Sequence, residues 1–255
     1  MKYSSGVSGK VDRDYQLVQS ELGALFVSFA YTLLPSLKSK KAHEYVLHGV
    51  CRRLMIVKKC IENIFTIYPL NRTSLLNNEE RTDIEINLHA FLINVHGIPD
   101  NLAWAYVLEH DSEIDPKLKE GQVGLFKKET QKHLPAEVRE CVNSAVLSHW
   151  HKQYAKGYRD ALAHRIPPYI PPSVLTPTHQ VKYRELEADM VQGIKEGDID
   201  RATKLLDEQS SIGSICGAFK QSHSESEGML LHPQIIVDAK TVMHIVRSVQ
   251  PHIAL

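Results

Sequence analysis

The chain has 255 residues, of which 43% are hydrophobic and 24% charged, a composition typical of a soluble globular protein with one large or two small domains. Thirty basic residues balance thirty acidic ones, so the formal net charge is zero. This balance excludes a basic field over the whole surface, and any contact with nucleic acid must come from a local patch.

The polar start and the scattered cysteines bear on the compartment. The first ten residues, MKYSSGVSGK, carry no charged-then-apolar leader. The longest apolar run, LGALFVSFAYTLLP over 22–35, holds fourteen residues, which is too short to span a bilayer and typical of a buried helix. The four cysteines form no CxxC pair, so we expect reduced, mostly buried thiols. These features predict a cytoplasmic protein without a membrane partner.

Two helices are predicted in the first third of the chain, because apolar residues recur there every three to five positions. One covers 14–34 and ends before Pro35. The other covers 41–68 and ends before Pro69.

A third helical pattern starts near Glu79. Gly97 and Pro99 predict a kink or a short break in it before the pattern resumes at Leu102. Residues 111–134 are polar and predict loops.

A long helix is predicted over 135–165, with Gly157 as its weak point. Pro167 disfavours helical geometry at the preceding residue, so the helix should end at about Arg165. The proline-rich segment that follows, up to Pro177, predicts an extended polyproline II chain along the surface.

Two short helices are predicted over 181–197 and 198–209, and a final helix over 233–250. The sequence shows no repeat and no run of alternating strands, so the predicted fold class is all-α: a helical bundle with an appended helical hairpin and a C-terminal helix. We expect the bundle core and its proline-rich tail in 1–179, and the hairpin and the C-terminal helix, packing on that core, in 180–255.

The stretch YRDALAHRIPP, residues 158–168, carries side chains suited to phosphate chemistry. Asp160 and His164 are four apart and share a helix face, so the carboxylate can orient the imidazole. Histidine moves protons at neutral pH, and Arg159 can bind a phosphate as a fork without any metal. An ordinary solvated helix end has the same spacing, and spacing alone does not decide between the two.

The hexapeptide RDALAH within this stretch fits the pattern of an arginine, a polar residue, three further residues and a histidine. It resembles the signature of the HEPN superfamily of helical-bundle proteins, which includes many metal-independent ribonucleases. Two blocks, INLHAFLINVHGIPDNLAWAY at 86–106 and YRDALAHRIPPYIPP at 158–172, resemble uncharacterised bacterial proteins grouped with that superfamily.

The resemblance implies roles for the motif residues. Arg159 would bind the scissile phosphate, His164 would act as general acid/base, and Asp160 would fill the variable polar position. The 2′-hydroxyl of RNA would attack its own phosphate and leave a cyclic phosphate. The resemblance also implies a homodimer in which two motifs meet in a cleft. In that superfamily the motif lies near the start of a bundle helix, whereas here it is predicted near the end of one.

Three residues outside the motif pair are supporting candidates. Asp100 and Asn101 either reach the motif from a neighbouring helix or cap a helix after the kink, and capping is the favoured interpretation. Tyr158, next to Arg159, is the third supporting candidate.

The segment CRRLMIVKKC supplies the most basic part of the chain. It places Arg52, Arg53, Lys58 and Lys59 on one helix, where they either contact an RNA backbone or form a solvated charged face, and the solvated face is favoured. The sequence contains no HxxxH, HExxH or zinc-finger spacing, so we expect no metal and no other cofactor.

Two functions from different classes follow from these patterns, and a third interpretation is a structural dimer with no ligand. The first is a HEPN-like, metal-independent endoribonuclease, acting as a homodimer on RNA in the role of a toxin or defence component. The alternative is a non-catalytic helical module that binds a nucleotide or a protein partner, with Arg159 and His164 kept for recognition or structure.

Overall fold

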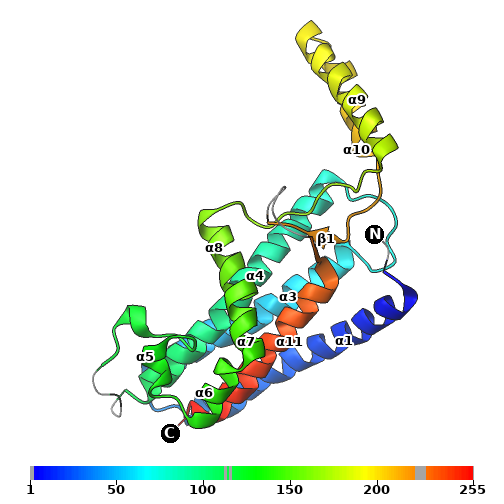
Figure 1. Ribbon diagram of the computed structural model, residues 1–255. Coiled ribbons are helices and arrows are strands. Elements are labelled where there is room, and N and C mark those ends of the chain that lie inside the picture. The colour runs from blue at the N-terminus through cyan, green and yellow to red at the C-terminus, as the bar shows by residue number, and fades with distance from the viewer. Residues whose placement is uncertain (1–2, 112–113, 115–116, 222–227, 255) are drawn as a thin grey trace.

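The computed structural model describes residues 3–111, 114, 117–221 and 228–254. Over these residues the chain folds as a bundle of helices, and strand structure there is confined to one short antiparallel ribbon (Figure 1). The all-α helical bundle predicted from the sequence is confirmed.

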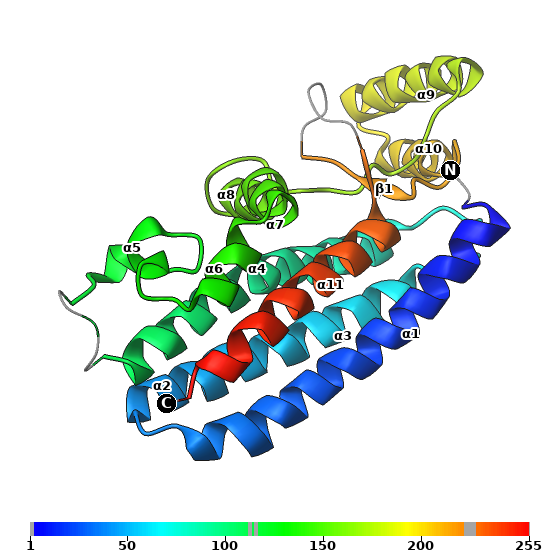
Figure 2. The same cartoon turned by 60° about the horizontal axis from the view of Figure 1, so that its bottom comes forward.

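Four long helices form the core. α1 (Ser5–Ser28), α3 (Arg52–Ile67), α4 (Asn78–Glu109) and α11 (Leu231–Val249) lie side by side (Figures 1 and 2). α4 packs against α3 and α11, and α1 packs against the same two helices. Their inward faces bury apolar side chains completely, including Val18, Leu22, Leu54, Ile61, Leu88, Phe91, Val242 and Val246. The C-terminal helix therefore shares one core with the first three.

Short elements complete the fold. They are η4 (Glu120–Gln122), α5 (Lys128–Gln131), β1 (Ala218–Phe219), β2 (Met229–Leu230) and η6 (Gln250–His252). η4 and α5 lie in the segment predicted as loops, and β1 pairs antiparallel with β2.

The first helix starts earlier than the predicted residue 14. The side chain of Ser4 accepts a hydrogen bond from the Val7 N–H and caps the helix, so the polar segment from Ser5 onward is helical as well. Apolar periodicity does not detect this first turn, because its residues bury little.

Beyond α1 the helix continues through the π-helical turn η1 (Phe29–Leu33) and the 3₁₀ turn η2 (Leu34–Ser36). The whole stretch Ser5–Ser36 is long and apolar enough, by length and composition alone, to cross a membrane. In this fold one side of it, including Leu22 and Phe29, is buried in the core of the bundle. That one-sided burial is typical of a bundle helix.

A second continuous helical run joins α2 (Lys40–Glu44), the π-helical segment η3 (Tyr45–Cys51) and α3, close to the predicted bounds. The buried carboxylate of Glu109 accepts hydrogen bonds from the backbone N–H groups of Lys38 (2.8 Å) and Ser39 (3.0 Å). These bonds tie the start of α2 to the end of α4.

α4 runs without interruption through Pro99, so the predicted break is absent. A capping box between Asn77 and Glu80 fixes its start. Gly97 and Pro99 are both buried. Packing against neighbouring helices offsets the roughly 3 kcal/mol cost of a proline inside a helix.

The single helix predicted over 135–165 is wrong in its interior. Ser144 has an extended backbone (ψ 147°), which ends α6 (Ala136–Asn143), and its side chain caps α7 (Ala145–Trp150). The π-helical turn η5 (His151–Ala155) follows α7 directly. The helix is therefore interrupted at Ser144, which caps α7, and it continues through Gly157.

α8 (Lys156–His164) continues from η5 and packs against α4. Arg165 has an extended backbone, so α8 ends where Pro167 predicted. This helix carries the RDALAH motif, and its contact with α4 determines what surrounds the motif.

The appended hairpin consists of α9 (Pro177–Glu196) and α10 (Ile199–Ser210), as predicted, and it projects from the bundle (Figure 1). Gly197 adopts a left-handed conformation (φ 78°) in the turn between them. The segment before α9 pairs with the segment after α10 through two isolated bridges, Tyr169 with Lys220 and Val174 with Ser214. The proline-rich segment therefore pairs with residues 214–220, and together the two segments connect the hairpin to the bundle.

Candidate functional site

The two motif residues lie on different sides of α8. Five positions on an α-helix correspond to about 140° around its axis. The side chain of Arg159 is partly buried, with 39% exposed, and its charge acts on His96 of α4. His164 is exposed in the last turn and makes no hydrogen bond or ion pair in the part of the chain described here. Within one chain, the fold therefore directs Arg159 toward α4 and His164 toward solvent.

Asp160 is bound to a neighbour other than His164. Its Oδ2 accepts a hydrogen bond from Lys156 Nζ at 2.7 Å, and its Oδ1 lies 3.2 Å from Arg159 Nε. The hydrogen bond from Lys156 lowers the pKa of Asp160. The Arg159 Nε itself is buried without a well-aligned hydrogen-bond partner. The Asp160 carboxylate therefore contacts Lys156 and Arg159, and it does not orient the imidazole of His164.

α4 presents a histidine and a carboxylate to α8. His96 Nδ1 lies 3.7 Å from Asp100 Oδ2, one helical turn further along. Asp100 sits in the interior of α4, so the capping interpretation is wrong for it and for Asn101. Partial burial raises the pKa of Asp100, while the charges of Lys127 and Arg159 act in the opposite direction. The charge of Arg159 therefore reaches Asp100 from α8.

A second imidazole stacks on His96. His151, the first residue of the π-helical turn η5, has its ring 6.0 Å from that of His96, with 28° between the planes. The ring of Phe126 also stacks on His151, with the two centroids 3.8 Å apart. Neither ring nitrogen of His151 makes a hydrogen bond in the described part of the chain. The stack positions His151 beside α4 and leaves its nitrogens available to a ligand.

Both imidazoles are neutral near pH 7. Burial lowers the pKa of His96 to about 4, and the positive charge of Arg159 adds to that effect. Burial likewise lowers the pKa of His151 to about 4, with His96 as the next cause. A bound anion would shift both pKa values upward, toward the range useful for proton transfer.

Tyr158 is part of the core and has no role at this surface. It is buried, its ring lies 5.6 Å from that of Phe219, and burial raises its pKa far above the usual range. Its place next to Arg159 in the sequence does not bring it to the same side of α8.

The four basic residues predicted on one helix are directed to different surroundings on α3. Arg53 is half-buried against α4, where it donates hydrogen bonds to Asn101 Oδ1 (2.8 Å) and Asn94 Oδ1 (2.9 Å). Lys59 pairs with Glu62 at 2.9 Å on the solvent side. Arg52 is exposed, and Lys58 lies near Gly23 of α1.

Sequence reasoning missed His96, His151 and Asn94. His96 and Asp100 could have been found from their spacing of four on a predicted helix. The position of His151 depends on the π-helical turn η5, which no apolar pattern reveals. In the part of the chain that the structure describes, no three His, Cys, Asp or Glu side chains gather as metal ligands.

Comparison with known proteins adds no relative: no family model, no curated protein and no solved structure matches the chain.

Proposed function

We propose that this chain is a metal-independent endoribonuclease whose reaction centre lies between α4 and α8. The observation that carries the proposal is that the charge of Arg159 acts on His96, against whose ring His151 stacks. Among the described residues, neither imidazole forms a hydrogen bond to another side chain. Arg159 keeps the role that the HEPN resemblance implies. Cleavage of this kind suits a toxin or defence component, which also stays a proposal.

The electrostatics of this centre favour a phosphodiester anion. Three cations act on these groups: Arg159 of α8 on His96 and Asp100, Lys156 of α8 on both imidazoles, and Lys127, at the start of α5, on Asp100. A guanidinium can bind two phosphate oxygens as a fork and neutralise the charge that develops on them. The bound phosphate raises the pKa of both imidazoles, so that one of them can hold a proton at neutral pH.

The two imidazoles take complementary roles. His151 accepts the proton of the 2′-hydroxyl, and the resulting oxygen attacks the adjacent phosphorus to form a 2′,3′-cyclic phosphate. The bond from phosphorus to the 5′-oxygen breaks, and His96 donates its proton to that oxygen. Asp100, 3.7 Å from His96 Nδ1, favours the protonated ring before this transfer. No metal-bound water takes part.

Cleavage of a single-stranded RNA in the presence of a chelator tests the proposal. We expect His96→Gln and His151→Gln each to lower the cleavage rate by about 10²-fold or more, because each removes one proton-transfer group. Arg159→Lys should also be strongly impaired, since an ammonium keeps the charge and loses the fork. A matched variant, His164→Gln, should keep the wild-type rate.

Product and substrate controls identify the reaction. The products should carry a 2′,3′-cyclic phosphate, and a substrate with a 2′-deoxy group at the scissile position should resist cleavage. A wild-type protein that leaves a broad RNA panel intact contradicts the proposal. If instead His164→Gln abolishes cleavage while the α4 and η5 variants retain it, the centre is the one implied by the HEPN motif.

A further inference from the structure

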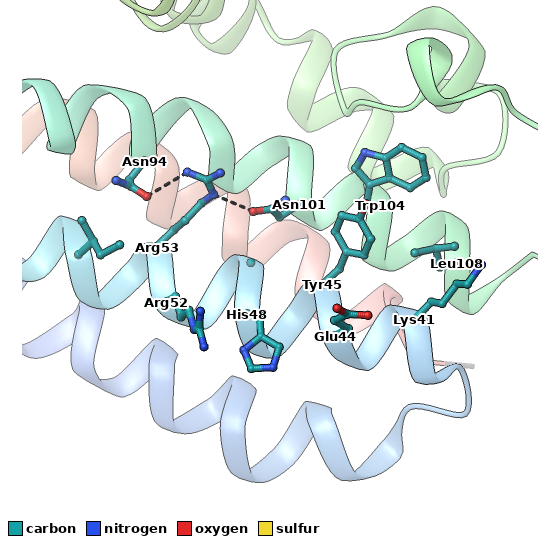
Figure 3. Close-up of a pocket in the computed structure, with 12 residues that line it drawn as sticks. Lys41, Glu44, Tyr45, His48, Arg52, Arg53, Asn94, Asn101, Trp104 and Leu108 are labelled. Carbon is teal, nitrogen blue, oxygen red and sulfur yellow. Dashed lines mark hydrogen bonds between the residues drawn. The ribbon is translucent and has the colours of Figure 1, made fainter.

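A pocket with a volume of about 720 Å³ opens between α4 and the helical run α2–η3–α3 (Figure 3). It lies on a different side of α4 from His96 and Asp100, because positions 94, 97 and 101 form a separate stripe of that helix. Its lining combines cations, amides and aromatic rings, among them Lys41, Tyr45, Arg52, Arg53, Asn101 and Trp104. The volume lies within the range of small-molecule sites.

Arg53 is held in one geometry across α4. Its Nε donates to Asn101 Oδ1 and its Nη1 donates to Asn94 Oδ1, as the dashed lines in Figure 3 show. Asn94 Nδ2 in turn donates to the Ala90 carbonyl at 2.7 Å, which directs the amide oxygen of Asn94 toward the guanidinium. The two amides, one from each side, keep the guanidinium in place before any ligand arrives.

Two glycines make room for this arrangement. A Cβ at Gly97 would lie 2.5 Å from Arg53 Cζ, so only glycine allows the guanidinium to cross α4 there. A Cβ at Gly49, in η3, would lie 2.8 Å from Asn101 Cγ. The close approach of Arg53 and Asn101 thus depends on the absence of a side chain at both positions.

The hydrogen-bond partners of Arg53 do not compensate its charge, although Asp100 of α4, outside the pocket lining, acts on it and raises its pKa. In the described part of the chain it forms no ion pair, and both of its hydrogen-bond acceptors are neutral amides. Burial lowers its pKa, which means that the charged form is held at some cost. Two of its five N–H donors are used, and the others remain for an anion. Lys41 and Arg52 add positive charge to the lining, against the single carboxylate of Glu44.

The aromatic pair supplies a surface for a planar ring. Tyr45 and Trp104 stack on one another with centroids 5.4 Å apart and 19° between the planes, and both are only partly buried. They lie at one end of the pocket, beyond Asn101 as seen from Arg53 (Figure 3). Stacking on aromatic side chains contributes about 1–3 kcal/mol per nucleobase in proteins that bind single strands.

We propose that this pocket binds a nucleoside phosphate, with the phosphate on Arg53 and Arg52 and the base against the Tyr45–Trp104 pair. The π-helical segment η3 carries Tyr45 and Gly49. Such segments are rare in proteins, and those that occur often lie at functional sites. A free nucleotide and the terminal nucleotide of an RNA present the same chemistry here. The lining of this pocket shares no residue with the proposed cleavage centre, and the two are linked only through the charge of Arg53, which also acts on His96 and Asp100. The proposal does not rest on the cleavage reaction.

Binding of AMP to the full chain, measured by titration calorimetry, tests this proposal. We expect Gly97→Ala and Arg53→Lys each to weaken AMP binding by about tenfold or more, because one displaces the guanidinium and the other removes its fork. Lys59→Ala is the matched control: it removes a charge from the same helix, outside the pocket, and should leave the affinity unchanged. His96→Gln should also bind AMP as the wild type does.

The parts of the ligand are separated by further titrations. Ribose 5-phosphate should bind about tenfold or more weaker than AMP, because it lacks the base, and Trp104→Leu should reduce that difference. Absence of AMP binding, or equal losses in Lys59→Ala and Arg53→Lys, overturns the proposal. Tighter binding of a 5′-phosphorylated RNA dinucleotide than of AMP supports it and identifies an RNA end as the source, whereas equal affinity supports it for the free nucleotide. Circular dichroism checks that each variant folds. If Gly97→Ala does not fold, the AMP affinity of Arg53→Lys alone decides the test.

Discussion

Asp238 of α11 is a carboxylate in the core, and among the described residues no cation pairs with it. Its Oδ1 accepts hydrogen bonds from Trp150 Nε1 (2.8 Å) and Gln234 Nε2 (2.9 Å). Burial raises its pKa to about 7, and these two bonds only partly oppose that effect. Tyr158 also lies near enough to feel its charge. The group therefore holds a proton in the native state over a pH range in which the unfolded chain has lost it.

The sign of the resulting pH dependence follows from linkage. The unfolded pKa of an aspartate is about 3.9, and the native pKa of Asp238 is higher. The native state binds more protons between these values, so the contribution of Asp238 to stability falls as pH rises from about 4 to about 7 and is constant above that. We expect Asp238→Asn to be more stable than the wild type at pH 8 and closer to it at pH 5, as measured by urea unfolding. An unchanged difference at both pH values would contradict a raised pKa.

Single residues also show why only part of the candidate sites was predictable. Arg159 and Asp160 were identifiable because chemistry and spacing lie in one hexapeptide. Arg53 was noticed only as one of four charges, since its partners Asn94 and Asn101 come from another helix. A stripe of two amides and a small residue at spacings of three and four on α4 is the signal that was available.

Two glycines with nothing near their missing Cβ atoms differ in backbone conformation. Gly157 lies in α8 with helical geometry, and Gly197 has φ 78° at the end of α9. An added methyl group meets no steric contact at either position. The difference between them is therefore purely one of backbone preference.

The same substitution should have opposite effects at these two positions. Gly157→Ala should stabilise the protein by about 0.5–1 kcal/mol, because alanine loses less conformational freedom in a helix. Gly197→Ala should destabilise the hairpin by about 1 kcal/mol, because alanine disfavours the left-handed region. Urea unfolding measures the first effect, and hydrogen exchange of the α9 and α10 amides measures the second. Equal signs would mean that one of the two backbone conformations is misassigned.

At the level of elements, apolar periodicity located the long helices and missed local exceptions. The run α2–η3–α3 and the helices α9, α10 and α11 begin and end near their predicted limits. α3 and α11 bury regular apolar stripes, and Gly197 marks the end of α9. Two features were not predicted: the helix break at Ser144 and the continuity of α4 through Pro99. Both depend on a side-chain cap or on tertiary packing, which local sequence signals describe poorly.

Across the whole molecule, α4 is the element that both candidate sites share. One stripe of it, with Asn94 and Asn101, faces α3, and the neighbouring stripe, with His96 and Asp100, faces α8. The segment 94–101 thus contributes to the pocket and to the proposed cleavage centre at once. A substitution at Pro99 that changes the course of α4 should therefore disturb both sites. The side-chain variants described above each affect only one of them.

The oligomeric state decides how the α8 motif is used. The HEPN resemblance implies a homodimer, and we expect sedimentation velocity to show one at micromolar concentration. The proposed centre draws Arg159, His96 and His151 from a single chain, so mixing the inactive Arg159→Lys and His151→Gln proteins should restore no RNA cleavage. If His164→Gln instead proves inactive alone, recovery of activity on mixing it with Arg159→Lys would show that a composite site forms between protomers. A monomer that cleaves RNA would remove the dimer from the mechanism and leave the α4–α8 centre in place.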